Sequence, residues 1–323
     1  MTTFITSIAQ LSLYVENGPT DGVDFARLLP TIRKVEREFV APLFPAVWLE
    51  RWRDETLLTQ LNETESTIRD LLCEAVGHLA TWKYAKTAAV LLTGSGMQKM
   101  ENEHFSSAYK DDKQEFKADH EADGLAALEA ALREAVLYHA DLQGFIITDA
   151  YENATARLVN FTKDFAQSRY LVSYKTFQTL LPIIELIERE TVIPLLSSTF
   201  YAALKTEQYD PSVSDEKRTL LRYLREGIGQ YAIAIATEMN LITLEGNQVF
   251  TREWKNNNDL ENRTAPRKDL YEVALKTREA FAFRYFKAAN QFLNDNATAL
   301  VWTAPPPRVA YKSTRIEIGL KSL

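Results

Sequence analysis

Apolar residues recur every three or four positions through residues 25–43, and residues 177–195 carry the same stripe. This spacing places the apolar side chains on one face of a helix, so the pattern predicts an α-helix over each stretch. Asp24 and Thr176 precede or open the stripes with side-chain oxygens suited to accept from free backbone N–H groups. We therefore expect these two residues to be the helix N-caps.

Prolines punctuate both predicted helices at matching places. Pro30 and Pro182 are easiest to place in a first helical turn, so regular helix is expected to begin there. Pro42 and Pro194 are expected to end the helices, because the residue before a proline is biased away from the helical region.

The rest of each half reads as three more helices joined by short turns. The expected ranges are 44–56, 64–92 and 112–140 in the first half, and 196–206, 215–243 and 265–293 in the second. Gly94 and Gly246 are expected to end the middle, long helix, and Gln248–Thr251 reads as a strand or hairpin arm. Gly77 and Gly229 lie inside that helix, where glycine costs up to about 1 kcal/mol relative to alanine, so a packing requirement is expected there.

One alignment at an offset of 152 residues relates the two halves. Leu28-Leu29-Pro30 matches Leu180-Leu181-Pro182, and Glu36-Arg37-Glu38 matches Glu188-Arg189-Glu190. The same register holds through Gly77/Gly229 and Gly94/Gly246, which indicates a gene duplication. Thr6–Gln10 resembles Thr162–Gln167 at a slightly larger offset. We predict a mainly α protein of two tandem homologous helical-bundle domains, 1–150 and 151–300, each with a short strand or hairpin.

Two segments lie outside the repeat pattern. Residues 142–175 join the halves, and Phe145-Ile146-Ile147 within them reads as a strand. An extended C-terminal arm, 301–323, begins at three prolines that favour an extended backbone. It then alternates polar and apolar residues, as a strand does. Its interface candidates are Arg315, Ile316, Ile318 and Leu320. A lone strand needs an edge to pair with, either in the same chain or in a neighbouring subunit.

Composition narrows the classes of partner. The net charge of −7 argues against a specific nucleic-acid surface, which clustered Lys and Arg would provide. Cys73 is the single cysteine, so an intramolecular disulfide is excluded. Apolar runs fall far short of the ~20 residues that span a bilayer, and the N-terminus lacks a signal-peptide pattern, so no membrane partner is expected.

Candidate chemistry is sparse. Glu36/Glu38 and Glu188/Glu190 are the most repeated polar residues, but side chains two apart on a helix point to different faces. A structural role is therefore expected, with Glu36 and Glu188 near the apolar stripe and paired with an arginine of a neighbouring helix.

The histidines and Cys73 lack the spacing of metal ligands. His78, His104, His120 and His139 are far apart in the sequence, so no metal site is expected. Cys73 reads as a small buried hydrophobe.

Glycine and tryptophan likewise indicate no site. Gly94-Ser95-Gly96 follows a predicted helix C-terminus, whose dipole disfavours phosphate. Trp48, Trp52 and Trp82 read as core or interface residues. We expect no catalytic residue and no cofactor.

With the duplicated Leu-Leu-Pro…Glu-Arg-Glu…Pro-Leu helix in view, the chain resembles an uncharacterised protein family of phages and prophages of Bacteroidetes. The resemblance also includes the opening from Phe4 to Val15 and the Lys-…-Ile-x-Ile-Gly tail from Lys312 to Leu320. In broad outline the helical unit is similar to head–tail connector adaptor proteins, although this chain carries two units.

The resemblance implies a virion structural protein that is assembled in the host cytoplasm and is not an enzyme. A head–tail adaptor or neck ring component is the first expectation, with the chain itself and the portal and tail proteins as partners. A tail or baseplate component of a phage or related contractile injection particle is the second. An enzyme with an unrecognised inter-domain site is the alternative of another class, and a cytosolic interaction protein also stays open.

Overall fold

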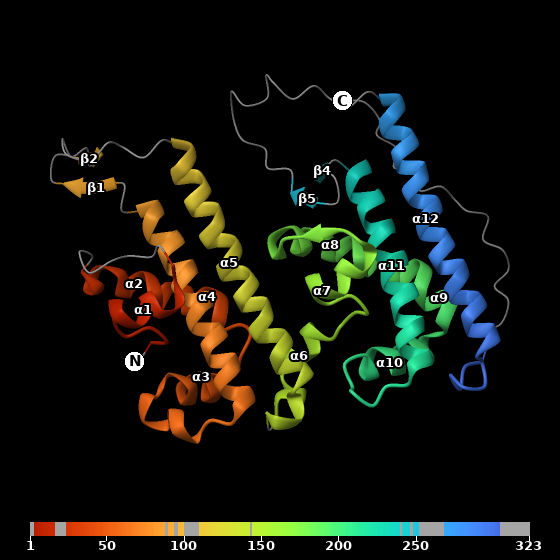
Figure 1. Ribbon diagram of the computed structural model, residues 1–323, viewed down its shortest axis with the longest axis horizontal. Coiled ribbons are helices and arrows are strands. Elements are labelled where there is room, and N and C mark those ends of the chain that lie inside the picture. Colours follow the sequence, from red (N-terminus) through yellow and green to blue (C-terminus); the bar gives the residue numbers. More distant parts are fainter. Residues whose placement is uncertain are drawn as a thin grey trace.

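Two long helix pairs dominate the computed structural model (Figure 1). In the first half α4 (Glu63–Thr87) packs against α5 (Lys110–Leu137), and in the second α11 (Asp215–Glu238) packs against α12 (Lys268–Asp295). The prediction of a mainly α protein with two tandem helical units is confirmed. The structure describes residues 3–16, 24–87, 90–93, 96–99, 110–142, 144–239, 241–245, 248–251 and 268–303.

Shorter elements surround each pair in a similar order. The first half contains α1 (Ile8–Tyr14), α2 (Phe25–Val35), the π-helical segment η1 (Glu36–Val40), α3 (Ala46–Arg53), and the 3₁₀ turns η2 (Glu55–Gln60) and η3 (His139–Asp141). The second contains α7 (Thr162–Phe165), the 3₁₀ turn η5 (Ala166–Ser168), α8 (Tyr174–Ile187), the π-helical segment η6 (Glu188–Val192), α9 (Ile193–Leu196) and α10 (Ser198–Glu207). A π-helical segment follows α2 in the first half and α8 in the second, at the same position of the repeat.

The two N-cap predictions have different outcomes. Asp24 caps α2, since its Oδ1 accepts from the N–H of Ala26 at 2.9 Å. Thr176 was the wrong choice for α8. Ser173 is the cap there, and its Oγ accepts from the N–H of Thr176 at 3.2 Å. Thr176 itself is buried within the first turn.

The proline predictions are mostly corrected. Pro30 and Pro182 lie inside α2 and α8 and do not begin them, because the caps set each start at an earlier residue. Both prolines are on the exposed side, where water can reach the carbonyl that each leaves unbonded. Pro42 follows η1 as expected, whereas Pro194 lies in the first turn of α9, where a missing N–H costs nothing.

A hairpin follows α4 and another follows α11. Both helices end before the glycines that were expected to stop them. β1 (Val90–Thr93) pairs antiparallel with β2 (Gly96–Lys99), and β4 (Ile242–Glu245) pairs with β5 (Gln248–Thr251). Apolar and β-branched residues favour strands after Thr87 and Glu238. The expected strand at 248–251 is therefore confirmed. Gly94 and Gly246 fall between paired strands and lie outside the described residues.

The segment between the halves is helical, so the expected strand at Phe145–Ile147 was wrong. It forms the 3₁₀ turn η4, after Gly144 at φ +80°, and leads into α6 (Asp149–Ala154). Gly144 turns the chain sharply there, and Phe145 enters the core. The short strand β3 (Leu171–Val172) pairs in parallel with β5.

Two hydrophobic cores correspond to the two halves. The first gathers buried residues from Phe4 to Phe161, and the second from Leu158 to Trp302. The exact domain limits 1–150 and 151–300 stay predictions. Of the arm 301–323, the structure describes only Val301–Thr303, so Arg315, Ile316, Ile318 and Leu320 lie outside the described residues.

Candidate functional site at the junction of the repeats

A buried glutamate opens the π-helical segment of each repeat. Glu36 is 5% exposed and Glu188 is 2% exposed. Oε1 of Glu36 accepts from the N–H of Phe4 at 2.6 Å, and Oε1 of Glu188 accepts from the N–H of Leu158 at 2.9 Å. Each carboxylate thus ties its helix to the first segment of its own repeat, here called the entry segment (residues 3–15 and 157–170). The structural role expected for this pair agrees with these contacts.

The second oxygen of each carboxylate has a different partner in the two repeats. Arg53 of α3 pairs with Glu36 at 2.9 Å, as the sequence suggested. Glu188 instead accepts from the hydroxyl of Tyr201 at 2.6 Å, so the expected arginine partner is wrong for this repeat. Glu38 and Glu190 point to the exposed side and pair with Lys83 and Arg189.

Phe4 and Leu158 occupy equivalent places. Their carbonyls accept from residues 152 apart, Cys73 Sγ at 3.6 Å and Arg225 Nε at 2.9 Å. The entry segments therefore align at an offset of 154, and the sequence match of Thr6 with Thr162 was misplaced by two residues. Cys73 is fully buried, as expected, and burial raises the pKa of its thiol to about 11.

Gly77 and Gly229 permit the close approach of the same entry segments. A Cβ on Gly77 would lie 2.6 Å from Val15 Cγ2, and one on Gly229 would lie 2.3 Å from Ser168 Cβ. No larger residue fits without movement of the neighbour, so the expected packing requirement is present in both repeats.

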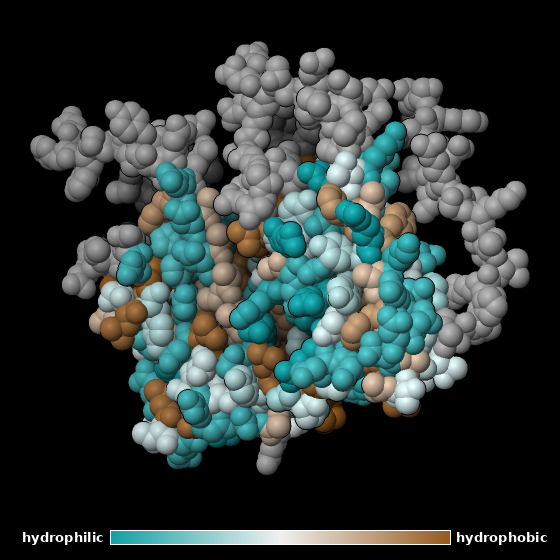
Figure 2. Space-filling view, turned by 45° about the vertical axis from the view of Figure 1, so that its right-hand side comes forward, coloured by the Kyte–Doolittle hydropathy of each residue, from teal (hydrophilic) through white to brown (hydrophobic). Residues whose placement is uncertain are grey.

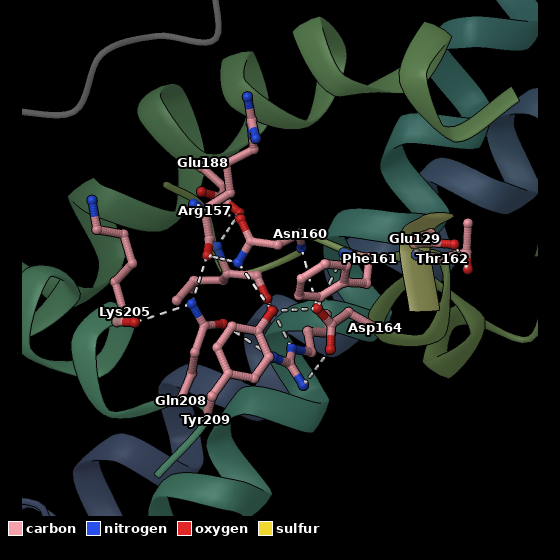
Figure 3. Close-up of polar contacts among 12 residues, drawn as sticks. Glu129, Arg157, Asn160, Phe161, Thr162, Asp164, Glu188, Lys205, Gln208 and Tyr209 are labelled. Atoms are coloured by element: carbon pink, nitrogen blue, oxygen red, sulfur yellow. Dashed lines mark hydrogen bonds and ion pairs between the residues drawn. The ribbon is translucent and has the colours of Figure 1, made fainter. Parts of the chain in front are cut away.

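The second repeat adds a buried polar network that has no counterpart of the same residue types in the first (Figure 3). Asp164 is at its centre and is 5% exposed. Its Oδ1 pairs with Arg225 Nη1 at 3.1 Å, and its Oδ2 accepts from the Tyr209 hydroxyl at 2.6 Å and from the N–H of Asn160 at 3.2 Å. A buried charge pair with this many hydrogen bonds holds its members in one geometry.

Arg157 and Gln208 extend this network toward α10. The amide nitrogen of Gln208 donates to the carbonyl of Arg157 at 2.7 Å, and its amide oxygen accepts from Arg225 Nη2 at 3.0 Å. The Arg157 side chain reaches the other way and binds Glu185 of α8 through Nε at 2.8 Å. Residues 157–164 are therefore tied to α8, α10 and α11 together.

Glu129 of α5 carries the connection across to the first repeat. It is 7% exposed, and its two oxygens accept from the N–H and the hydroxyl of Thr162, at 2.5 and 2.7 Å. Thr162 begins α7 of the second repeat. Nearby, Lys175 pairs with Glu121 at 3.6 Å as a more exposed contact. The junction thus has a buried carboxylate that accepts two hydrogen bonds at its centre and an ion pair at its periphery.

Burial dominates the electrostatics of this region. It raises the pKa of Glu129 above its usual range and that of Glu188 to about 7, although hydrogen bonds oppose both shifts. Burial, with the Glu129 charge second, raises the pKa of Tyr174 to about 12. The network joins segments of the second repeat to one another, and the Glu129–Thr162 contact joins this repeat to the first.

Two histidines that are 42 positions apart in sequence meet in the first repeat. His78 of α4 and His120 of α5 are 8% and 5% exposed, and their Nδ1 atoms are 2.9 Å apart. Sequence spacing gave no sign of this contact, because it depends on how α4 and α5 pair. Among the described residues, no group of three or more His, Cys, Asp or Glu side chains is placed to hold a metal ion.

The tryptophans have the expected structural roles. Trp52 is fully buried, Trp48 packs on it at 5.6 Å between ring centroids, and Trp82 packs against the first core. In the described part of the chain, no helix is long and apolar enough to cross a membrane.

The fold and junction define a mainly α protein of two homologous bundles locked in tandem. A family model described as "Family of unknown function (DUF6712)" matches residues 42–134 and again residues 192–308. These matches cover more than half of the chain, so the chain belongs to this family, and the paired match agrees with the internal repeat. No curated protein and no solved structure matches the chain.

Proposed function

We propose that this protein is a virion structural protein of a phage or prophage, and that it acts as a head–tail adaptor or neck ring component. Its work is protein–protein assembly: with further copies of itself, with the portal and with tail proteins. Each chain contributes two helical bundles to such an assembly.

The locked junction is the observation that carries the proposal. Buried Glu129 accepts from Thr162 of the other repeat, and the buried Asp164–Arg225 pair ties α7, which contains Thr162, to α11. That arrangement suits a part that keeps two bundles in fixed orientation under load. An enzyme with a site between the repeats would instead present converging polar groups to a substrate at this place.

Exposed apolar side chains supply candidate contact points. Val47 is 74% exposed and Ile147 is 84% exposed. Trp48, which follows Val47, and Phe145, two residues before Ile147, are in tilted ring contact with centroids 5.5 Å apart, so α3 and η4 are neighbours. Figure 2 shows one face of the molecule as largely hydrophilic with separate hydrophobic patches.

Helix α12 is the counterpart of α5 in the second repeat, but it does not carry the same side chains as α5 at the junction. Helices α5 and α12 have equal length and align from their first residues, at an offset of 158. Three buried positions of α5, Glu129 among them, correspond to exposed polar positions of α12: Glu129 to Lys287, Leu132 to Asn290 and Val136 to Asn294. Contacts to neighbouring subunits are therefore expected elsewhere than on this face of α12, as at the capped end of a repeat array.

Mass spectrometry of purified particles tests the proposal. Particles are separated into capsids that retain the neck and into free tails. The adaptor proposal predicts the protein in the capsid fraction at a constant ratio to portal protein. Presence in tails alone would favour the tail or baseplate alternative, and absence from all particle fractions would refute a virion role.

A further inference from the structure

The His78–His120 contact is specific to the first repeat. At the repeat offset, His78 corresponds to Gln230, which donates to the carbonyl of Ser168 at 2.8 Å. His120 corresponds to Arg278 at the offset of 158 that relates α5 to α12, and Arg278 donates to the hydroxyl of Tyr170 at 3.2 Å. The second repeat thus joins its long helices to residues 168–170 through an amide and a guanidinium group. The first repeat uses two imidazoles facing each other.

Hydrogen bonding between two Nδ1 atoms limits the number of protons that the pair can hold. One Nδ1 must carry a proton and donate, and the other must offer its lone pair. A first extra proton can enter at the outer nitrogen of the donor ring and leave this bond intact. The next has to go to the accepting Nδ1 of the other ring. It would end the hydrogen bond and place two cations in contact.

The surroundings compensate this second charge only in part. Asp123 Oδ2 is 3.9 Å from His78 Nδ1, and its side chain is 61% exposed. Asp119 and Asp123, both of α5, favour the charged form of His120, but burial and the His78 charge outweigh them and lower its pKa. On the remaining sides lie Phe116, edge-on to His120, and Gly124, against the His78 Cβ.

We propose that this imidazole pair is an acid-sensitive latch between α4 and α5: uptake of the second proton opens the contact in the first repeat and leaves α11 and α12 closed. The second repeat serves as the comparison, because it has Gln230 and Arg278 in place of the imidazoles. Its buried carboxyl Glu188 binds a proton as the pH falls through about 7, which acts in the stabilising direction. The inference does not depend on the proposed virion function.

Hydrogen–deuterium exchange of the full chain tests the latch, at about pH 7.5 and about pH 5 with a chelator present. After correction for intrinsic exchange rates, we expect about tenfold lower protection of α4 and α5 at the lower pH, and no loss of protection in α11 and α12. His78→Gln, which installs the residue of the second repeat, should remove this difference. His139→Gln should preserve it, because His139 lies outside the pair and contacts the Val136 carbonyl.

Equal acid-induced loss in both repeats would overturn the proposal, as would an unchanged difference in His78→Gln. If that variant fails to fold, an NMR titration of the wild-type histidines decides the question. The latch predicts that the imidazole pair takes up its protons in two separate steps. Uptake by the pair in a single step would contradict it.

Discussion

At the residue scale, the most informative feature is the buried glutamate repeated in each bundle. The sequence identified Glu36 and Glu188 because the duplication preserved them at one offset. It gave no signal for Asp164, Asn160 or Arg225, which have no repeated counterpart of the same type. Their roles depend on tertiary contacts of the second repeat, and a single sequence carries no pattern for such contacts.

Glu188 should make folding stability depend on pH. Its pKa is about 7 in the folded protein and near 4.5 in the unfolded chain, so the folded state binds the proton more tightly. The stabilisation is complete below about pH 4.5 and is lost as pH rises through about 7. Glu188→Gln should remove a contribution on the order of 3 kcal/mol to the change in unfolding free energy across this window. Denaturant titrations at several pH values measure it.

The exposed Glu190→Gln is the matched control and should keep the wild-type pH dependence. Identical pH profiles for Glu188→Gln and wild type would show that Glu188 is charged in the fold throughout this range.

At the element scale, hydrophobic periodicity predicted the long helices α4, α5, α11 and α12 because their apolar positions keep the helical spacing over many turns. It failed at their ends. Strands β1 and β4 are only four residues long, and such short apolar runs continue a helical pattern as well as they begin a strand. Pro30 and Pro182 suggested helix starts that are too late, because the N-caps Asp24 and Ser173 begin these helices several residues earlier.

Alanine at the two helix-interior glycines should have unequal effects. The new Cβ of Gly77→Ala would meet the tip of Val15, which can move, and helix propensity returns up to about 1 kcal/mol. In Gly229→Ala the new Cβ would meet Ser168 Cβ, which is attached directly to the backbone and cannot turn away. We expect Gly229→Ala to lower the free energy of unfolding by about 2 kcal/mol and Gly77→Ala by less than about 1 kcal/mol. Chemical denaturation compares them, and the reverse order would contradict the packing described.

At the scale of the whole molecule, the duplication was predictable and the way the repeats join was not. One offset of 152 residues exposed the repeat, and the family model matches twice. The junction combines Glu129 of one repeat with Thr162 of the other. Nothing within one repeat unit encodes that pairing, so only the three-dimensional arrangement reveals it.

Removal of the central junction contact should destabilise the chain more than removal of the peripheral one. Glu129→Ala leaves the half-buried N–H and hydroxyl of Thr162 without this partner, at a cost of about 2 kcal/mol. Glu121→Ala breaks a half-exposed ion pair with Lys175, which is worth less than about 1 kcal/mol. Equal losses for the two variants in denaturation experiments would argue against Glu129 as the centre of the junction.

Assembly should be sensitive to the exposed apolar surface of η4 and insensitive to the polar face of α12. Ile147→Asp places a charge at an 84% exposed apolar position, and should weaken self-association at least tenfold in sedimentation experiments. Asn290→Asp, on the exposed polar face of α12 described above, should leave association unchanged. The opposite pattern would move the subunit contact to α12.

Electron microscopy of the purified full chain tests the central claim most directly, namely that two locked bundles form a building block for assembly. The account predicts closed rings with one repeating subunit shape, each subunit showing two bundles. Single particles with the mass of one chain, under all conditions and also in the presence of portal and tail proteins, would contradict it.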